Sequence, residues 1–349
     1  MLKKVAINDV AVSVWGRCLT EFNGYPGWEF PKILEENGLV LRPLKSGTFS
    51  SYIALEHSSK SLNRIRRFVP VNRRFLISLE PRAVTPNQYR SRVRRMYNKV
   101  VVQSHLQIYA GQNVVVCPAG LLPSEEILIR DLEVASSTIR AELAIGVVNQ
   151  NKFSFVRDSR YKLRREYIVK LAKSGYNVNL AGPNWDRGLF WHFYMQFKSL
   201  IWLMLVEKTI PDLTKWQFPI PKFGGLKLFG RVADEVSFMR NYDFALVVEN
   251  DPDYVSEKLF NAIRAGAVPI YVGPDLGTFG IPKAVAICDF VSPAQLLEKL
   301  QVSSSAETLK EYRDSGRNWL LNSKTSEAWN HDKGFRDIVS QLAISIYSE

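Results

Sequence analysis

The sequence predicts an α/β protein made of two doubly wound, Rossmann-like domains that face each other across a cleft. Short apolar runs rich in branched residues recur along the chain, which is the pattern of strands buried in parallel sheets, and segments of helical periodicity lie between them. The length of 349 residues allows two domains with separate hydrophobic cores. The apolar content of 46% and the charged content of 23% are those of an ordinary globular protein, which agrees with this fold class.

The amino-terminal domain is expected over residues 1–145. Its predicted strands are Val5–Val14, Ser51–Leu55, Phe75–Leu79, Val100–Val102 and Asn113–Cys117. A helix is predicted at Asn87–Tyr97, between two of these strands. The polar segment Arg140–Lys152 is the expected linker, so that a second structural unit begins near Phe153.

The carboxyl-terminal domain is expected over residues 150–322, followed by a helical tail over residues 323–349. Helices that close the chain are predicted at Pro293–Leu300, Ala306–Leu321 and Lys333–Tyr347.

A strand, a helix and a second strand are predicted in the most informative part of this domain. Phe244–Val248 is a short apolar run of the kind buried on both faces of a parallel sheet, and Asp251-Pro252-Asp253 supplies the turn that ends it. A helix should begin near Ser256, and Gly266 suits the left-handed position just past its end. Val268–Val272 then forms the next buried strand.

Four polar residues fall where the first of these strands meets the helix: Asn250, Tyr254, Glu257 and Lys258. In open parallel sheets, ligands bind beyond the carboxyl ends of the strands, where a helix amino-terminus offers unpaired N–H donors. The first helical turn brings a hydroxyl, a carboxylate and an ammonium to this place. The pattern therefore predicts a site for a phosphate and a sugar.

The same residues carry a family resemblance. Glu249-Asn250, the run from Asp253 to Leu259 (Asp-Tyr-Val-Ser-Glu-Lys-Leu) and the run from Ala265 to Pro269 (Ala-Gly-Ala-Val-Pro) resemble the signature of the alpha-1,3/4-fucosyltransferase family. Asp251 and Ser256 depart from it, since the family usually has a small hydroxyl residue and a threonine there. The resemblance implies a GT-B glycosyltransferase that moves fucose from GDP-fucose to a saccharide hydroxyl with inversion.

Positive charge against the departing diphosphate is assigned first to Lys258, which stands in the first helical turn. By the resemblance, Arg164 is the second such group, in the segment that precedes the first helix of the donor domain. Arg160 is an alternative to it that the sequence leaves open. A guanidinium in this place would hold phosphate oxygens in bidentate fashion.

The resemblance also implies the remaining donor contacts. Glu257 accepts hydrogen bonds from the ribose hydroxyls, and Tyr254 and Asn250 position the sugar nucleotide. Glu249 and Ser256 are further possible donor-binding residues, although Glu249 could serve only to hold the loop.

The general base is expected from the other domain, because the acceptor binds across the cleft. Phe75–Leu79 is a buried strand followed at once by Glu80, and a carboxylate at the end of a buried strand is a common place for a tuned acid or base. The family has a glutamate after a comparable strand, so Glu80 is the expected base. Alternatively, Glu80 only pairs with Arg82 or Arg73.

Two further patterns suggest other transferases. Asp251-Pro252-Asp253 has the Asp-x-Asp form that binds a divalent ion in metal-dependent enzymes, but such a short match arises often by chance, and no obligatory metal or other cofactor is expected. Glu249 and Glu257 are spaced as Glu-x7-Glu, which is found in retaining transferases of the same architecture. A GT-B enzyme that uses another nucleotide sugar, with retention, is therefore the alternative.

Charge and apolar patterning bear on the partners. The net charge of +12 and two arginine clusters, residues 64–74 and 90–95, could face an anionic membrane, an acidic glycan or nucleic acid. A basic, non-enzymatic glycan or nucleic-acid binder thus stays open, but few aromatic residues lie among the arginines and nucleic acid is not expected. The apolar stretch Leu189–Val206 contains His192, Gln196 and Lys198, so a buried or interfacial helix or shallow membrane contact is expected.

The three cysteines, Cys18, Cys117 and Cys288, are too few and too scattered for a disulfide framework. The amino-terminal residues Met1–Asp9 lack the apolar core of a secretory signal. A cytoplasmic location is the resulting expectation, and peripheral attachment to a membrane surface stays open.

Overall fold

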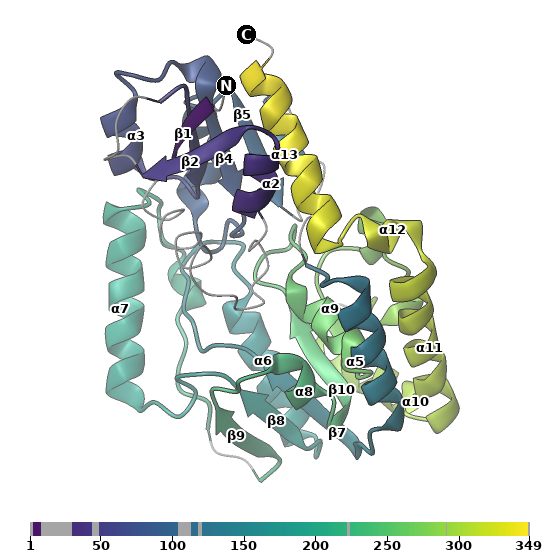
Figure 1. Ribbon diagram of the computed structural model, residues 1–349. Coiled ribbons are helices and arrows are strands. Elements are labelled where there is room, and N and C mark those ends of the chain that lie inside the picture. Colours follow the sequence, from purple (N-terminus) through teal and green to yellow (C-terminus); the bar gives the residue numbers. More distant parts are fainter. Residues whose placement is uncertain are drawn as a thin grey trace. The chain divides into compact units, whose positions relative to one another are not determined.

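The computed structural model describes residues 3–7, 30–43, 49–103, 113–117, 121–221, 224–290 and 292–347. The chain divides into two compact units, each built on a parallel sheet (Figure 1). The first unit comprises Met1–Ser124 together with Glu327–Glu349, and the second comprises Glu125–Ser326. Two Rossmann-like α/β units are therefore present, as the sequence predicted.

The first unit has a parallel sheet whose described strands follow the order β2-β1-β3-β4-β5-β6. These strands are β1 (Lys3–Ile7), β2 (Leu39–Pro43), β3 (Ser51–Leu55), β4 (Arg74–Ser78), β5 (Lys99–Gln103) and β6 (Val114–Cys117). Its described helices are α2 (Phe30–Glu36), α3 (Ser59–Ile65), α4 (Ser91–Arg94) and α13 (His331–Tyr347). The predicted strands at residues 51–55, 75–79, 100–102 and 113–117 are confirmed within one or two residues.

Two predictions for this unit need comment. A strand was predicted at Val5–Val14, and the structure has β1 at Lys3–Ile7. The predicted residues after Ile7 lie outside the described part of the chain. The single helix predicted at Asn87–Tyr97 is wrong: a 3-10 turn at Pro86–Tyr89 and the short helix α4 replace it. Arg90 between them has extended backbone angles (φ −73°, ψ 138°), so no continuous helix forms.

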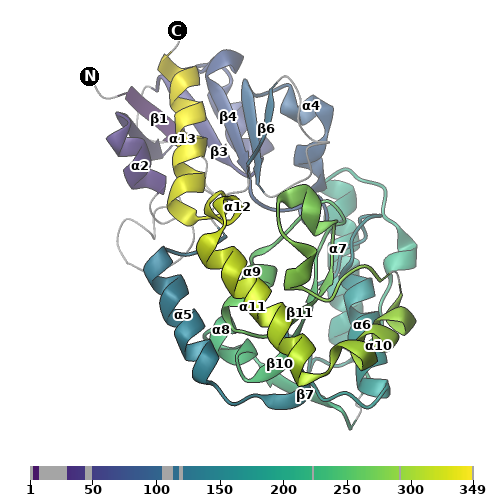
Figure 2. The same ribbon diagram turned by 90° about the vertical axis from the view of Figure 1, so that its right-hand side faces the viewer.

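The carboxyl-terminal helix α13 belongs to the core of the first unit. Ile338, Val339 and Leu342 are fully buried and pack in one cluster with Val5 and Ile53 of the sheet. Figure 2 shows α13 lying along these strands. The residues predicted as a tail are helical, as expected. They pack against a sheet whose strands come from the beginning of the sequence, and so complete its hydrophobic core.

The second unit has a parallel sheet with described strands in the order β11-β10-β7-β8-β9. These are β7 (Ala141–Val148), β8 (Val178–Ala181), β9 (Leu226–Gly230), β10 (Tyr242–Val248) and β11 (Val268–Val272). Its helices are α5 (Glu125–Ser137), α6 (Tyr161–Lys173), α7 (Leu189–Leu205), α8 (Glu235–Met239), α9 (Glu257–Arg264), α10 (Pro293–Ser303) and α11 (Ala306–Asn322), and α12 (Lys324–Glu327) leads out of the unit. The three helices predicted at the carboxyl end of the chain are confirmed.

The strand order reverses beside β7. From β7 the chain moves through α6 to β8 and then through α7 to β9, always in one direction across the sheet. It then returns through α8 to β10, on the other side of β7. Loops at the carboxyl ends of β7 and β10 therefore diverge to opposite faces, which leaves a crevice where ligands bind in such sheets.

The predicted linker at Arg140–Lys152 is wrong, because most of it forms β7, at the centre of this sheet. Ala144–Val148 is buried, whereas the first three residues of the strand are exposed and Leu143 has a positive φ of 53°. The charged residues Arg140 and Glu142 at the beginning of the strand concealed the apolar run that follows them. The boundary of the second unit accordingly lies at Glu125 instead of residue 150, and α5 belongs to it.

The predicted strand, turn, helix and strand at residues 244–272 are confirmed. Every residue of β10 and of β11 is buried, and Ser256 is the N-cap of α9. Gly266 follows α9 with a positive φ of 68°, which favours glycine because it has no Cβ. The positions of the polar residues around this helix are therefore set by the two buried strands.

Candidate functional site

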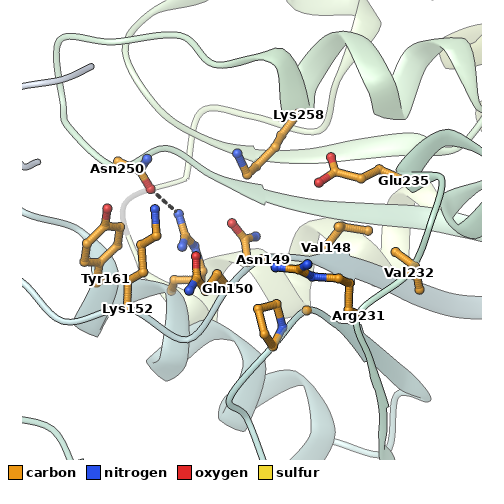
Figure 3. A pocket seen from close by; sticks show the side chains of 13 residues that line it. Val148, Asn149, Gln150, Lys152, Tyr161, Arg231, Val232, Glu235, Asn250 and Lys258 are labelled. Atoms are coloured by element: carbon orange, nitrogen blue, oxygen red, sulfur yellow. Dashed lines mark hydrogen bonds between the residues drawn. The ribbon is translucent and has the colours of Figure 1, made fainter. Parts of the chain in front are cut away.

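A pocket of about 370 Å³ opens at the crevice of the second unit (Figure 3). Its lining comes from the carboxyl ends of β7, β8, β9 and β10 and from the first turns of α6, α8 and α9. The lining residues are Val148, Asn149, Gln150, Lys152, Tyr161, Arg164, Gly182, Pro183, Arg231, Val232, Glu235, Asn250 and Lys258.

The charge of this lining is strongly positive. Lys152, Arg164, Arg231 and Lys258 are cations, and Glu235 is the one carboxylate among the lining residues, so the formal balance is four minus one, or +3. Figure 3 shows Lys258 and Lys152 pointing into the pocket from different elements, near Asn250. Such a concentration of fixed positive charge suits a di-anionic group such as a diphosphate.

Arg164 is the most constrained of these cations. It is 3% exposed, and its Nη2 donates to the carbonyl of Val248 (2.7 Å) and to Oδ1 of Asn250 (2.6 Å). Its Nε is buried without a hydrogen-bond partner, and no carboxylate of the described residues forms an ion pair with it. Burial lowers its pKa, but an arginine stays charged, so a buried cation with neutral partners faces the pocket.

Lys258 lies opposite, in the first turn of α9. Its side chain is mostly buried, and its Nζ donates to Oε1 of Glu257 at 2.6 Å. Burial acts to lower the pKa of Lys258, but Glu257 and Glu235 raise it, and the result lies above the ordinary value. Burial acts to raise the pKa of Glu257, but the charge of Lys258 and its hydrogen bond lower this pKa below the ordinary value. Lys258 is therefore an ammonium over the whole physiological pH range.

The other residues predicted for the donor surround this pocket without lining it. Glu249 is 1% exposed, and its Oε1 accepts the N–H of Ser256 at 3.0 Å, which ties the end of β10 to the start of α9. Burial raises the pKa of Glu249 to about 7. Tyr254 and Ser256 are also buried. The structure thus brings Arg164, Asn250 and Lys258 into the pocket and leaves Tyr254, Glu249, Ser256 and Glu257 beside it.

Arg160 and Arg164 have different surroundings. Arg160 is the N-cap of α6, and its backbone N–H donates to the carbonyl of Asn250 at 3.1 Å, but its side chain does not line the pocket. Arg164 lies one turn further along and reaches the pocket directly. The geometry favours Arg164 for contact with an anion.

Glu80 lies in the first unit, two residues after the end of β4 at Ser78, and is exposed. Its backbone N–H donates to Oε1 of Glu56 (2.9 Å), and its carbonyl accepts from the hydroxyl of Tyr89 (2.6 Å). Burial raises the pKa of Glu56 to about 7. The position at the end of a buried strand is as expected, and the role as base stays a prediction.

Several lining residues escaped the sequence reasoning. Asn149, Gly182 and Arg231 each follow a different strand of the sheet, but their local sequences carry no signature. The rule that ligands bind at the carboxyl ends of parallel strands would have found them if β7, β8 and β9 had been placed in order. Glu235, on α8, was missed for the same reason.

The Asp-x-Asp pattern has a structural explanation. Asp251 is fully buried, and its Oδ1 accepts the backbone N–H of Asp253 at 3.2 Å, as in a turn closed by its own side chain. Among the described residues no group of three or more His, Cys, Asp or Glu side chains could hold a metal ion. The expectation of no obligatory metal stays a prediction.

Comparison with known sequences points to one family. Residues 206–343 match the model of glycosyltransferase family 10 (fucosyltransferase) C-term. A fucosyltransferase-like protein of Arabidopsis thaliana is 41% identical over 71 residues, which are 19% of this chain and 14% of that protein. The matched segment therefore spans a small part of that relative's length.

Comparison with solved structures points to one fold. A crystal structure of an alpha1,3-fucosyltransferase with GDP-fucose gives a TM-score of 0.56 at 12% identity, covering 99% of this chain and 90% of that one. The Anabaena protein HepE in complex with UDP-glucose gives 0.51 at 12% identity, covering 99% and 100%. Identities this low show the fold alone, and the fold is of the GT-B type.

Proposed function

Since residues 206–343 match the model of glycosyltransferase family 10 (fucosyltransferase) C-term, we propose that the chain is a member of this family and that it transfers fucose from GDP-fucose to a saccharide hydroxyl with inversion at the anomeric carbon. The observation that carries the proposal is the cationic pocket at the reversal point of the second sheet, where Arg164, Lys258 and Lys152 converge. A nucleoside diphosphate is the ligand class that this charge and position suit best.

In the proposed reaction the acceptor hydroxyl oxygen attacks C1 of fucose from the face opposite the bond to the β-phosphate. A base, for which Glu80 is the candidate, removes the proton of that hydroxyl as the new C–O bond forms. The C1–O bond to the phosphate breaks, and both its electrons leave with GDP. Arg164 and Lys258 then offset the negative charge that develops on the diphosphate. No covalent enzyme intermediate and no metal step are needed.

Arg164 supports this role by its surroundings. Its two hydrogen bonds through Nη2 fix the guanidinium plane, while its Nε is left without a partner. A phosphate oxygen would supply the missing acceptor and the missing negative charge together. The cation is thus held in place before the donor arrives, which lowers the entropic cost of binding.

The identity of the donor is tested by binding and transfer. Calorimetry with GDP and UDP, and turnover with labelled GDP-fucose, GDP-mannose and UDP-glucose over a panel of saccharides, are the measurements. Binding of GDP and transfer of fucose are expected. Tight binding of UDP without binding of GDP would refute the donor assignment.

The diphosphate contact is tested with a pair of neighbouring arginines. In Arg164→Met the donor affinity should fall roughly 10- to 100-fold, because a charge-assisted hydrogen bond is lost. Arg165→Met is the control: Arg165 is also buried, but it donates to Asn151 and Phe218 and does not line the pocket. An equal loss of GDP affinity in both variants would mean that a general loss of stability is responsible.

The base is tested with Glu80→Gln. Turnover should fall by a factor of about 100 or more, with GDP affinity unchanged, since a general base contributes on this scale. Wild-type turnover in this variant would remove Glu80 from the mechanism.

Retention with another nucleotide sugar is the second candidate. It depends on the Glu249-x7-Glu257 spacing, yet Glu249 is buried and bonded to the backbone of Ser256, outside the pocket lining. This position favours inversion. The anomeric configuration of the product, determined by NMR, decides between the two.

The acceptor is proposed to be a saccharide, as in protein or glycan glycosylation, and nucleic acid is not proposed as a partner. The described helices are all too short or too polar to cross a membrane. An anionic membrane surface is proposed as a partner, and transfer from GDP-fucose would not itself require it.

A further inference from the structure

Helix α7 has its polar side inward and its apolar side outward. His192 and Gln196 are 1% and 0% exposed. With Ser199 and Leu203 they form a stripe at helical spacing that faces the rest of the second unit. On the opposite side, Phe190, Tyr194, Phe197, Ile201 and Leu205 form an exposed stripe at the same spacing. Phe190 and Leu205 are the most exposed of them, at 93% and 70%. An amphipathic helix on a soluble domain has the reverse orientation.

Hydrogen bonds fix this orientation. The side chain of Gln196 makes a reciprocal pair with the backbone of Gln217: its Nε2 donates to the carbonyl (2.8 Å) and its Oε1 accepts the N–H (2.7 Å). His192 contacts Asn151 through Nε2 at 3.2 Å, and the hydroxyl of Ser199 donates to the carbonyl of Phe153. Rotation of α7 about its axis would leave these buried polar groups without partners, at a high cost.

Further exposed apolar side chains lie beyond the helix. In the segment that follows α7, Ile210, Leu213 and Phe218 are 92%, 64% and 67% exposed. Figure 1 shows α7 as an outlying helix of the second unit, away from its sheet. Exposed apolar side chains in such number usually mark a contact with a membrane or another protein.

The charges beside the stripe favour an anionic partner. Within α7 the sequence contains Lys198 but neither Asp nor Glu. The exposed residues Asp186 and Arg187, of opposite charge, precede the helix, and after it Glu207 is buried while Lys208 is exposed. Asp212 is further along, and it caps the turn at Leu213–Lys215. The apolar stripe is thus bordered by positive charge, which is the composition of helices that lie in the headgroup region of a bilayer.

The length of α7 excludes a spanning role. Its 17 residues extend over about 26 Å at 1.5 Å per residue, and a bilayer core is about 30 Å thick. A helix of this length with a hydrogen-bonded polar face can lie parallel to the surface with its other face among the acyl chains.

We propose that the face of α7 formed by Phe190, Tyr194, Phe197, Ile201 and Leu205 inserts into the interface of an anionic lipid bilayer and holds the protein at its surface. Attachment is separate from sugar transfer. It is measured without donor or acceptor, so failure of one proposal leaves the other intact.

The test uses the full chain and vesicles of phosphatidylcholine with and without phosphatidylglycerol, analysed by co-flotation at low and high salt. The wild type should bind the anionic vesicles more tightly, because the exposed cations Lys198 and Lys208 lie on and just after α7. In Phe190→Ser/Leu205→Ser, binding should fall by about tenfold or more, since affinity scales with buried apolar area. Ile139→Ser/Val302→Ser is the matched control, because Ile139 and Val302 are 95% and 81% exposed elsewhere in the same unit.

A second measurement needs no change to the stripe. Trp202 is 39% exposed on α7, so brominated lipid should quench part of the tryptophan fluorescence of the wild type, and less of it in Trp202→Phe. Absence of binding to anionic vesicles would overturn the proposal, and so would equal binding by the two double variants. A concentration-dependent dimer that Phe190→Ser/Leu205→Ser dissociates, without vesicle binding by the wild type, would assign the face to a second copy of the chain instead.

Discussion

Glu249→Gln should change how the stability of the second unit depends on pH. Glu249 is buried beneath the loop between β10 and α9, where its Oε1 accepts the N–H of Ser256 and its Oε2 has no hydrogen-bond partner. Burial is the main cause that raises its pKa from 4.5 to about 7, and the hydrogen bonds to Ser256 and the charge of Lys258 oppose this. Glutamine keeps the carbonyl acceptor and removes the charge.

The sign follows from proton linkage. Between pH 4.5 and 7 the unfolded chain has released the proton of Glu249 while the folded chain retains it, so the free energy of unfolding falls as pH rises. At 1.36 kcal/mol per pH unit, this interval corresponds to a loss of about 3 kcal/mol, complete above the folded pKa. Glutamine does not titrate. The variant should therefore gain roughly 3 kcal/mol on the wild type between pH 4.5 and pH 8.

Thermal unfolding by calorimetry at a series of pH values is the assay. A difference of this size corresponds to roughly 6 to 12 °C in Tm for a unit of about 200 residues. Glu56→Gln is the control, because Glu56 has a similarly raised pKa but lies in the first unit, so its effect should appear in a different transition. If the Tm of Glu249→Gln and that of the wild type run parallel from pH 4.5 to 8, the argument from burial is wrong.

Three further outcomes are expected. Gly182→Ala should lower the free energy of unfolding by roughly 1–3 kcal/mol and weaken GDP binding. The reason is that Gly182 has a φ of 128° and a Cβ there would collide with the carbonyl of Asn149. A Tm and a GDP affinity equal to those of the wild type, both measured by calorimetry, would contradict this. Arg231→Ala should weaken GDP binding roughly 3- to 10-fold at low salt and less at high salt, since Arg231 is an exposed cation of the pocket; a salt-independent loss would speak against a charge effect. Treatment with EDTA should leave fucose transfer unchanged, and recovery of lost activity with Mg²⁺ or Mn²⁺ would show that a metal is required after all.

The sequence was most informative where local signals agreed with the global fold. The strand β10, the turn after it and helix α9 were predicted because apolar runs, Asp251-Pro252-Asp253 and Gly266 each act over a few residues. Lys258 and Asn250 entered the candidate site through this local reasoning, and both line the pocket. Local patterns therefore locate one wall of the site.

The rest of the site depends on contacts distant in sequence. Lys152, Gly182 and Arg231 come together only because β7, β8 and β9 lie in that order beside β10. The central strand β7 was itself mistaken for a linker, since its first three residues are exposed and include the charged Glu142. In the same way, no local signal shows that α13 packs against a sheet formed by the beginning of the chain.

Arg164 and Lys258 differ in how the protein compensates their charges. Lys258 has a carboxylate partner in Glu257, so the protein itself offsets part of its charge. Arg164 has neutral partners, the carbonyl of Val248 and the amide of Asn250, and its Nε has none. Burying a cation in this way costs free energy that folding alone does not recover. The proposed diphosphate would recover it, because the anion would bind next to a guanidinium that is already desolvated and oriented. The burial of Arg164 among neutral partners therefore both destabilises the fold and accounts for the affinity proposed for the donor.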